Sequence, residues 1–326
     1  MSFPVQRLRR LRRNPALREL VAEHRVRIED LIYPLFAVPG RGVRQEIPSL
    51  AGVYHLSIDQ LIEEAKGLRD LGILAILLFG VGSGKDSHAR AAYARDGIVQ
   101  KAVRALKKEV PELVIITDVC LCEYTNHGHC GIIKDGYLEN DSSAQLLAKV
   151  AVSHAEAGAD IVAPAAMIDG EVRAIRNALD EHGHTETIIM GYSAKYASKL
   201  YDLFYKSVET VLAFGDKRTH QMDFRNSDEA MREMALDIEE GADILMVKPA
   251  LFYLDIVQRA KSQFKMPLAV YNVSGEYAMI KAAAQLGKID ETKVVTEMMT
   301  AFKRAGADLI ITYHAKQIAQ FLRNPA

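Results

Sequence analysis

Lys248 stands at the end of the apolar run Asp243-Ile-Leu-Met-Val-Lys-Pro249 and is the first candidate for chemistry. The proline after it cannot continue a central strand or a helix interior, so Lys248 is predicted to lie where a buried strand ends. Burial disfavours the ammonium form and lowers the pKa of a lysine. A neutral amine attacks carbonyl groups and forms Schiff bases. The competing interpretation is a lysine whose head reaches water at a strand end.

The three cysteines are the second candidate, because Cys120, Cys122 and Cys130 fall within eleven positions with C-x-C-x₇-C spacing. An odd number of crowded thiols does not make a disulfide framework and indicates a reducing, cytoplasmic compartment. Three soft ligands suit zinc and would leave a fourth position open for water or substrate. Two alternatives stay open, namely a closed site completed by His127 or His129, and three reduced thiols without a metal.

The composition limits the classes of protein to which the chain can belong. Hydrophobic residues make up 49% and charged residues 25% of the 326 residues, and the formal net charge is -1. Such a chain can bury a full core. The near-zero charge argues against a general nucleic-acid or membrane role, and there is no apolar run of about 18 residues that would span a bilayer.

The elements that must position these residues follow a regular alternation. Helical patterns separate eight apolar, strand-like runs, at residues 31–38, 74–79, 113–117, 160–163, 187–191, 244–247, 268–271 and 309–312. Continuous apolar strands need helices on the outside, so the pattern predicts a (β/α)₈ TIM barrel of the α/β class over residues 30–326. Residues 1–29, with five arginines between positions 7 and 13, are predicted to form an N-terminal arm that contacts another subunit.

A short repeat supports the barrel. The sequence Gly-Ala-Asp ends a helix and opens a strand three times, closing at Asp160, Asp243 and Asp308. Glycine just past a helix can adopt the left-handed cap conformation, so the repeat is interpreted as structural.

In a barrel of this kind the chemistry lies at the carboxyl ends of the strands. The polar residues predicted there include Lys195 and Lys248, together with Asp118, Asp169, Ser193, Ser274 and Tyr313. A second ammonium nearby would lower the pKa of Lys248 further by like-charge repulsion. The polar residues at this end of the barrel, the rim, therefore favour Lys248 as an amine nucleophile over Lys248 as a solvated lysine.

Four segments together resemble the porphobilinogen synthase family, also called delta-aminolevulinic acid dehydratase. They are ITDVCLCEYTNHGHCG, MVKPALFYLDI, YNVSGEYAMIKAA and KRAGADLIITYHA, and the likeness extends over nearly the whole chain. The resemblance implies a (β/α)₈ barrel with an N-terminal arm, assembled as a homo-octamer. It also implies a lyase that joins two molecules of 5-aminolevulinate into porphobilinogen, early in tetrapyrrole and heme synthesis.

The resemblance implies a role for each matching residue. Lys248 would form the Schiff base with the first substrate molecule, Lys195 would be the second active-site lysine, and Asp118 would border the amino group. Ser274 and Tyr313 would hold the first carboxylate. The three cysteines would bind Zn²⁺ near the second molecule, and an allosteric Mg²⁺ would have Glu233 as its ligand.

The chain departs from the family pattern around the second substrate. Members of the family usually carry the motifs YGPFR and GDRKxYQ, whose two arginines clamp the carboxylate of the second substrate. In this chain Tyr205 replaces the first arginine and Lys217 replaces the second. Arg218 and Gln221 follow Lys217 in the second motif. Ala165 also replaces a serine. A phenol or a point charge is not equivalent to a bidentate fork. We therefore keep an alternative hypothesis, a paralogue that condenses a different second amine or amino-ketone. A third hypothesis, an inactive homologue, is disfavoured because both lysines and all three cysteines are present.

Overall fold

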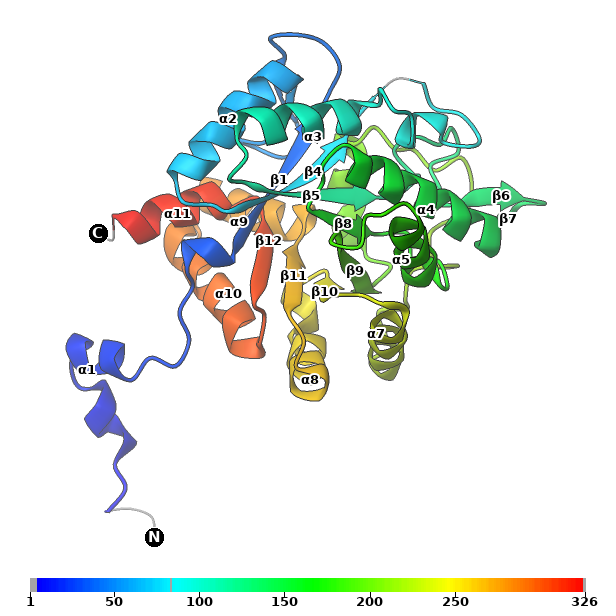
Figure 1. The fold of residues 1–326 in the computed structure, drawn as a ribbon. Coiled ribbons are helices and arrows are strands. Elements are labelled where there is room, and N and C mark those ends of the chain that lie inside the picture. Colours follow the sequence, from blue (N-terminus) through cyan, green and yellow to red (C-terminus); the bar gives the residue numbers. More distant parts are fainter. Residues whose placement is uncertain (1–4, 83, 325–326) are drawn as a thin grey trace.

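The computed structural model describes residues 5–82 and 84–324. Eight parallel strands form a closed barrel, because β1 pairs with β4 on one side and with β12 on the other. Helices surround the strands (Figure 1). The predicted TIM barrel is confirmed, and its strands are β1 (Leu31–Ala37), β4 (Ala75–Gly80), β5 (Val114–Val119), β8 (Ile161–Pro164), β9 (Ile188–Lys195), β10 (Ile244–Lys248), β11 (Leu268–Asn272) and β12 (Leu309–Thr312).

Most of the outer helices bury one face against the strands. In α3 the buried residues include Val99, Ala102, Val103 and Leu106, which recur at the helical spacing of an amphipathic element. The surrounding helices are α2 (Ile58–Asp70), α3 (Ile98–Glu109), α4 (Asn140–Glu156), α5 (Glu171–Glu181), α7 (Asp228–Glu240), α8 (Leu254–Phe264), α9 (Ser274–Gln285), α10 (Glu291–Ala305) and α11 (Ala315–Arg323).

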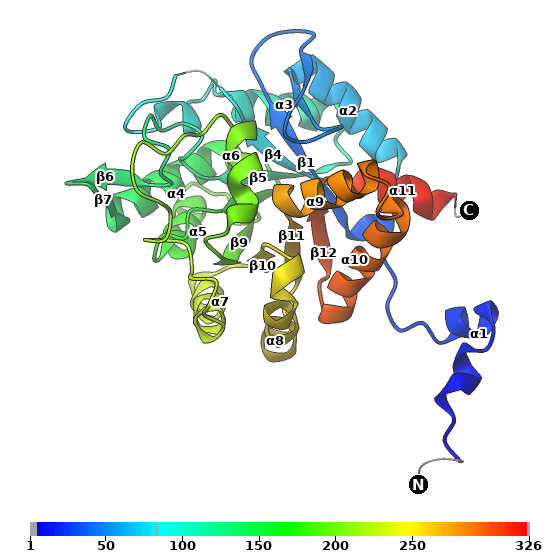
Figure 2. The same cartoon turned by 180° about the vertical axis from the view of Figure 1, so that it is seen from behind.

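Shorter helices and strands lie outside the eight strands of the barrel. A ribbon of β2 (Arg44–Glu46) and β3 (Tyr54–Leu56) extends the sheet from β1. A separate hairpin of β6 (Ile132–Lys134) and β7 (Tyr137–Glu139) projects from the barrel beside α4 (Figure 1). The helix α6 (Asp202–Ser207) follows β9 and lies across the barrel in the view from behind (Figure 2). The strand periodicity of the sequence did not predict these short pieces.

The Gly-Ala-Asp repeat has one structural use at the amino ends of the strands. Each aspartate carboxylate accepts a 2.8 Å hydrogen bond from a backbone N–H near the start of the neighbouring strand, namely Ile115 to Asp160, Ile189 to Asp243 and Leu268 to Asp308. The aspartates thus fix the register between adjacent strands at the end of the barrel opposite the predicted rim.

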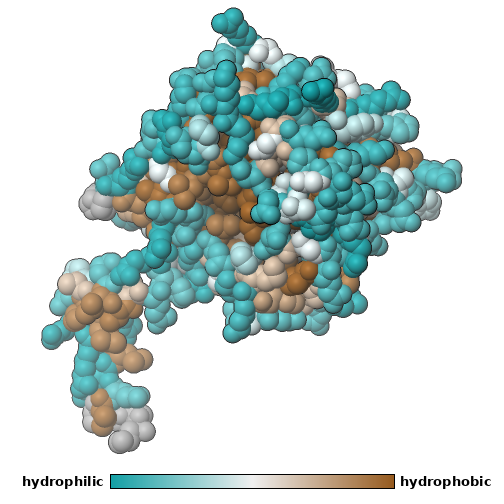
Figure 3. All heavy atoms as spheres, in the orientation of Figure 1, coloured by the Kyte–Doolittle hydropathy of each residue, from teal (hydrophilic) through white to brown (hydrophobic). Residues whose placement is uncertain are grey.

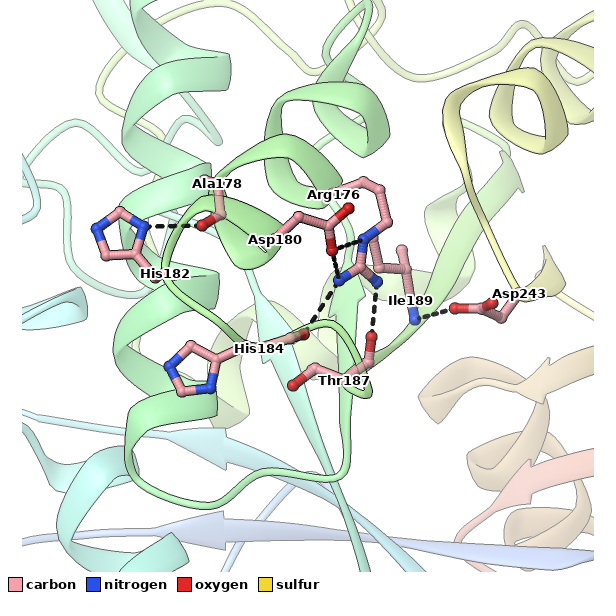
Figure 4. A network of polar contacts seen from close by, with 8 residues as sticks. All are labelled: Arg176, Ala178, Asp180, His182, His184, Thr187, Ile189 and Asp243. Atoms are coloured by element: carbon pink, nitrogen blue, oxygen red, sulfur yellow. Dashed lines mark hydrogen bonds and ion pairs between the residues drawn. The ribbon is translucent and has the colours of Figure 1, made fainter.

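Beside Asp243, the turn between α5 and β9 is held by Arg176 (Figure 4). Its guanidinium donates to the Asp180 carboxylate and to the carbonyl oxygens of Thr187 (2.8 Å) and His184 (3.1 Å). One planar side chain therefore binds two carbonyl oxygens of this turn, of which that of His184 also accepts from the Thr187 backbone N–H.

The N-terminal segment stands clear of the barrel in Figures 1 and 2. Its two short helices, η1 (Leu8–Arg12) and α1 (Pro15–Leu20), have no buried residue, and Leu8 and Leu20 are 75% and 78% exposed. Figure 3 shows their apolar side chains uncovered. Residues 1–4 of the predicted arm lie outside the described residues.

No helix in the described ranges is both long enough and apolar enough to cross a membrane.

Candidate active site

Lys248 ends β10 and lies inside the barrel mouth, with 4% of its surface exposed. Its carbonyl oxygen accepts hydrogen bonds of 2.9 Å from the Tyr201 hydroxyl and from the Tyr196 backbone N–H. Its ammonium group faces aromatic rings, with centroid distances of 4.2 Å to Tyr271 and 5.0 Å to both Tyr192 and Phe204. The lysine head is therefore enclosed and does not reach bulk water.

Burial, followed by the charge of Lys195, lowers the pKa of Lys248 to about 7, against the opposing charge of Asp118. At neutral pH a large share of this side chain is consequently a free amine. The two causes are those that the sequence suggested for a Schiff-base lysine.

Lys195 ends β9 and pairs in register with Lys248 on the adjacent strand. Its ammonium group donates a hydrogen bond to the Ala165 carbonyl oxygen. Burial lowers the pKa of Lys195, but negative charge on the neighbouring Cys130 and Cys120 sulfurs outweighs burial, and the net shift is upward. The two lysines thus differ in charge at neutral pH, with Lys195 held as an ammonium.

The three cysteines converge on one side of the same mouth. All three are free and buried, and their sulfur atoms lie within 4.8 Å of one another. Neither His127 nor His129 belongs to this group of donor atoms in the described part of the chain. Instead, His129 Nε2 lies 3.1 Å from the Phe214 carbonyl oxygen. In the described part of the chain no fourth donor atom lies within 4.8 Å of all three sulfurs, so the three buried sulfur donors fit a soft divalent cation with one open position.

Two carboxylates border the sulfurs. Asp118 lies on β5, and burial followed by the charge of Glu123 raises its pKa to about 7. Glu123 is buried, and its carboxylate accepts a 3.4 Å contact from Cys122 Sγ. Oxygens of Asp118 and Glu123 and the Cys120 sulfur also lie within 4.8 Å of one another. Sequence reasoning missed Glu123, although a charged residue inside an otherwise buried cysteine loop was a usable signal.

A single cavity joins these groups. Its volume is about 10 Å³, and its lining residues are Asp118, Cys120, Cys122, Glu123, Ala165, Lys195, Tyr201, Phe204, Tyr205, Lys217 and Lys248. A space of that size holds about one water molecule. The cavity is therefore too small for an organic substrate in this conformation, and Phe204 and Tyr205 of α6 form part of its wall.

Lys217 takes an unexpected position on the sulfur side. It is 5% exposed, its ammonium group lies 3.3 Å from Cys130 Sγ, and the same group lies 4.4 Å from the Tyr205 ring centroid. Burial lowers its pKa, but negative charge on the Cys122 and Cys130 sulfurs raises the pKa well above the usual value overall. Lys217 therefore serves as a buried counter-ion of the sulfur cluster.

Gln221 and Arg218, which follow Lys217 in the chain, lie in different surroundings. Gln221 is buried nearby, and its Nε2 atom has no hydrogen-bond partner among the described residues. Arg218 instead has 73% of its side chain exposed and pairs with Asp216 at 3.4 Å. Arg218 thus does not replace the missing arginine of the family pattern in this conformation.

Ser274 and Tyr313 lie behind the cavity and not in its lining. The Ser274 hydroxyl donates to the Leu200 carbonyl oxygen and accepts from the Phe204 backbone N–H, both at 3.1 Å. The Tyr313 hydroxyl lies 3.3 Å from that of Tyr271, whose ring faces Lys248. The Ser274 hydroxyl is thus held by residues 200 and 204, and the Tyr313 hydroxyl by Tyr271.

Glu233 lies outside the barrel mouth, on α7. It lines a separate cavity of about 550 Å³ together with other acidic residues, among them Asp169, Glu229, Asp237 and Glu240. Burial, followed by the charge of Asp169, raises the pKa of Glu233. The structure therefore does not bring Glu233 to the two lysines.

Comparison with known proteins gives a consistent assignment. The family model described as delta-aminolevulinic acid dehydratase matches residues 5–321. Curated dehydratases of that name from Synechocystis sp. and Synechococcus elongatus are 55% and 56% identical, covering 99% and 98% of this chain and 100% and 99% of their own. The crystal structure of the Toxoplasma gondii enzyme in complex with porphobilinogen matches with a TM-score of 0.96 and 43% identity, over 98% of this chain and 92% of that one. None of these matches supports the alternative hypothesis of a paralogue with another second substrate. The chain belongs to the delta-aminolevulinic acid dehydratase family.

Proposed function

We propose that the protein is a porphobilinogen synthase that condenses two molecules of 5-aminolevulinate into porphobilinogen, with loss of water. One observation carries the assignment of roles within the site. An amine whose pKa is lowered to about 7, that of Lys248, shares a small buried cavity with Cys120 and Cys122, whose sulfurs lie within 4.8 Å of that of Cys130. Each group has a use in joining two amino-ketones, and the family of the chain supplies the reaction.

Lys248 is the proposed nucleophile. Its amine attacks the ketone carbon of the first substrate, the carbonyl oxygen leaves as water, and a Schiff base remains. The neutral state needed for attack follows from the aromatic enclosure and from the charge of Lys195. Ser274 and Tyr313 are the proposed partners of the first substrate's carboxylate, from a position behind the rings that enclose Lys248.

Zn²⁺ is the proposed ion at Cys120, Cys122 and Cys130. The donor set fits zinc because three soft ligands leave a fourth position for an exogenous ligand. When bound, the ion supplies Lewis-acid polarisation of the second substrate. Lys195 and Lys217 offset the charge of the thiolates from two sides.

The second substrate is proposed to lie between the sulfurs and Tyr205. Lys217 is the remaining cation for its carboxylate, and the unpartnered Gln221 amide is a second donor nearby. Asp118 is proposed to border the amino group that stays free in the product. With only one point charge in place of two arginines, this carboxylate is expected to be bound weakly.

Three further assignments rest mainly on the family. Mg²⁺ is proposed to bind at Glu233, where the acidic cavity offers oxygen ligands. The arm of residues 1–29 is proposed to join the barrel of residues 30–326 to other copies in a homo-octamer, since its apolar side chains are uncovered in one chain. A cytoplasmic location is proposed from the three reduced thiols.

The decisive assay is the colorimetric measurement of porphobilinogen formed from 5-aminolevulinate. The wild-type protein with zinc should form product, and Lys248→Ala should not. Borohydride reduction in the presence of 5-aminolevulinate should trap an adduct whose mass locates it on Lys248. Wild-type activity no greater than that of Lys248→Ala would refute the proposed function. Removal of bound metal with a chelator, followed by reconstitution with zinc or magnesium separately, identifies the ion.

A further inference from the structure

A buried polar network joins the carboxyl ends of β10, β11 and β12. Its three members, Glu276, Asn272 and Thr312, are each 0% exposed. We name these three residues the rim clamp. None of them lines the cavity described above.

Glu276 is the centre of the rim clamp because its carboxylate receives four donors from two strand ends. One oxygen accepts from the backbone N–H groups of Ala250 (3.1 Å) and Leu251 (2.8 Å), which follow Lys248. The other accepts from the Val273 backbone N–H (3.0 Å) and the Asn272 side-chain amide (2.6 Å) at the end of β11. Burial raises the pKa of Glu276 to about 7, while the hydrogen bonds from these four donors lower it, so the donors stabilise the ionised form against burial.

Thr312 extends the rim clamp to the next strand. Its hydroxyl donates to the side-chain amide oxygen (Oδ1) of Asn272 at 2.8 Å and accepts from the His314 backbone N–H at 3.1 Å. Tyr313 lies between these two residues. The hydrogen bonds therefore run without interruption from the loop after β10 to the end of β12.

The position of the rim clamp matches the proposed first-substrate residues. Lys248 precedes Ala250 by two positions, Ser274 lies between Val273 and Glu276, and Tyr313 directly follows Thr312. A helix cap alone needs only the bond to the Val273 N–H of its own chain segment. The second carboxylate oxygen instead accepts from the loop that directly follows the strand carrying the amine.

On the basis of the proposed function, we propose that Glu276, with Asn272 and Thr312, is a positioning residue that fixes Lys248 relative to Ser274 and Tyr313. The rim clamp keeps the Lys248 amine beside the ketone of the first substrate while Ser274 and Tyr313 hold the carboxylate of the same substrate. Small misplacements of reacting groups cost large factors in rate, so a loosened clamp slows Schiff-base formation.

The main test compares two variants at opposite ends of the same strands. In Glu276→Gln the amide NH₂ must face two N–H donors in either orientation, which disrupts the clamp without changing its volume. The matched control is Asp308→Ala, which removes the bond to the Leu268 N–H at the far end of β11. Both are expected to lower the melting temperature. At a temperature where each is folded, Glu276→Gln should trap 5-aminolevulinate on Lys248 at least about tenfold more slowly, a cost of about 1.4 kcal/mol. Asp308→Ala should trap at the wild-type rate.

A second pair of variants keeps the test usable if Glu276→Gln does not fold. Thr312→Val removes the hydroxyl at nearly constant shape, and Thr312→Ser keeps it. We expect slow trapping in the first and restored trapping in the second. Equal trapping rates in all clamp variants and the wild type would overturn the proposal.

A further readout separates failure of the clamp from failure of the proposed function. If the wild-type protein forms no adduct with 5-aminolevulinate, the proposed function fails, but the clamp can still be tested. Reductive methylation of Lys248 by formaldehyde and cyanoborohydride needs only a neutral, reachable amine. Its pH midpoint should rise in Glu276→Gln, because the lysine leaves its aromatic enclosure, and should stay unchanged in Asp308→Ala. An unchanged midpoint in Glu276→Gln would contradict the positioning role.

Discussion

Replacing Lys248 by methionine should abolish activity and at the same time make the fold more stable. The pKa of Lys248 falls from 10.5 to about 7 on folding, because burial and Lys195 disfavour its charged form. One pKa unit corresponds to about 1.4 kcal/mol, so the buried lysine costs on the order of 4 kcal/mol of stability at pH 7. Methionine has a similar length and carries no charge, so it removes this cost.

The direction in which the free energy of unfolding changes with pH tests this prediction more strictly than its size. Between pH 7 and pH 10.5 the unfolded chain holds a proton on this lysine that the folded chain does not, so the stability of the wild type should rise with pH. The advantage of Lys248→Met should therefore be largest at and below pH 7 and vanish near pH 10.5. Urea unfolding at a fixed protein concentration, followed by circular dichroism at several pH values, measures it.

Lys195→Met is the matched control for this measurement. The pKa of Lys195 is raised on folding, so its removal should destabilise the protein near neutral pH. If Lys248→Met showed no gain at pH 7, or a gain that did not shrink with rising pH, Lys248 would not be the neutral amine that the site requires.

Four other outcomes follow from the same structure. Cys120→Ser should lose most of its bound zinc after dialysis as well as its activity; full metal content by elemental analysis would remove the cysteines from the metal site. Arginine at both Tyr205 and Lys217 should restore a bidentate carboxylate clamp and lower the KM for 5-aminolevulinate about ten- to hundredfold; no change would show that the second carboxylate binds elsewhere. Burial lowers the pKa of His154 from 6.5 to about 3, so the free energy of unfolding should fall as the pH drops below 6.5, by about 2 kcal/mol at pH 5. The variant His154→Leu should not show this loss when unfolding is measured at acid pH. Asp243→Ala should cost about 1 kcal/mol of unfolding free energy through the lost bond to its neighbouring strand, with activity per folded molecule unchanged.

The fold was predictable because its signals are local and repeat many times. Each strand is a short apolar run and most helices are amphipathic, so eight units predict the closed barrel even where single boundaries shift by a few residues. The Gly-Ala-Asp repeat was recognisable as structural. Its purpose, the bond from each aspartate to the neighbouring strand, became visible only once the strands were placed side by side.

The candidate site was predictable in part for the same reason. Lys195 and Lys248 end adjacent strands, and the cysteines are close in sequence, so the barrel brings them together without further information. Glu123 and the contact between Lys217 and Cys130 were not foreseen. These residues come from loops, whose path depends on packing and not on periodicity.

The sequence by itself determined the barrel, the family and the residue types at its rim, because periodicity and motif identity are written in neighbouring residues. Only the tertiary structure decided which charges face one another. It turned Lys217 toward the sulfurs and Arg218 toward solvent. It also gave two adjacent lysines opposite pKa shifts, since the shift of each depends on the depth of burial and on the sign of charges that are distant in the chain.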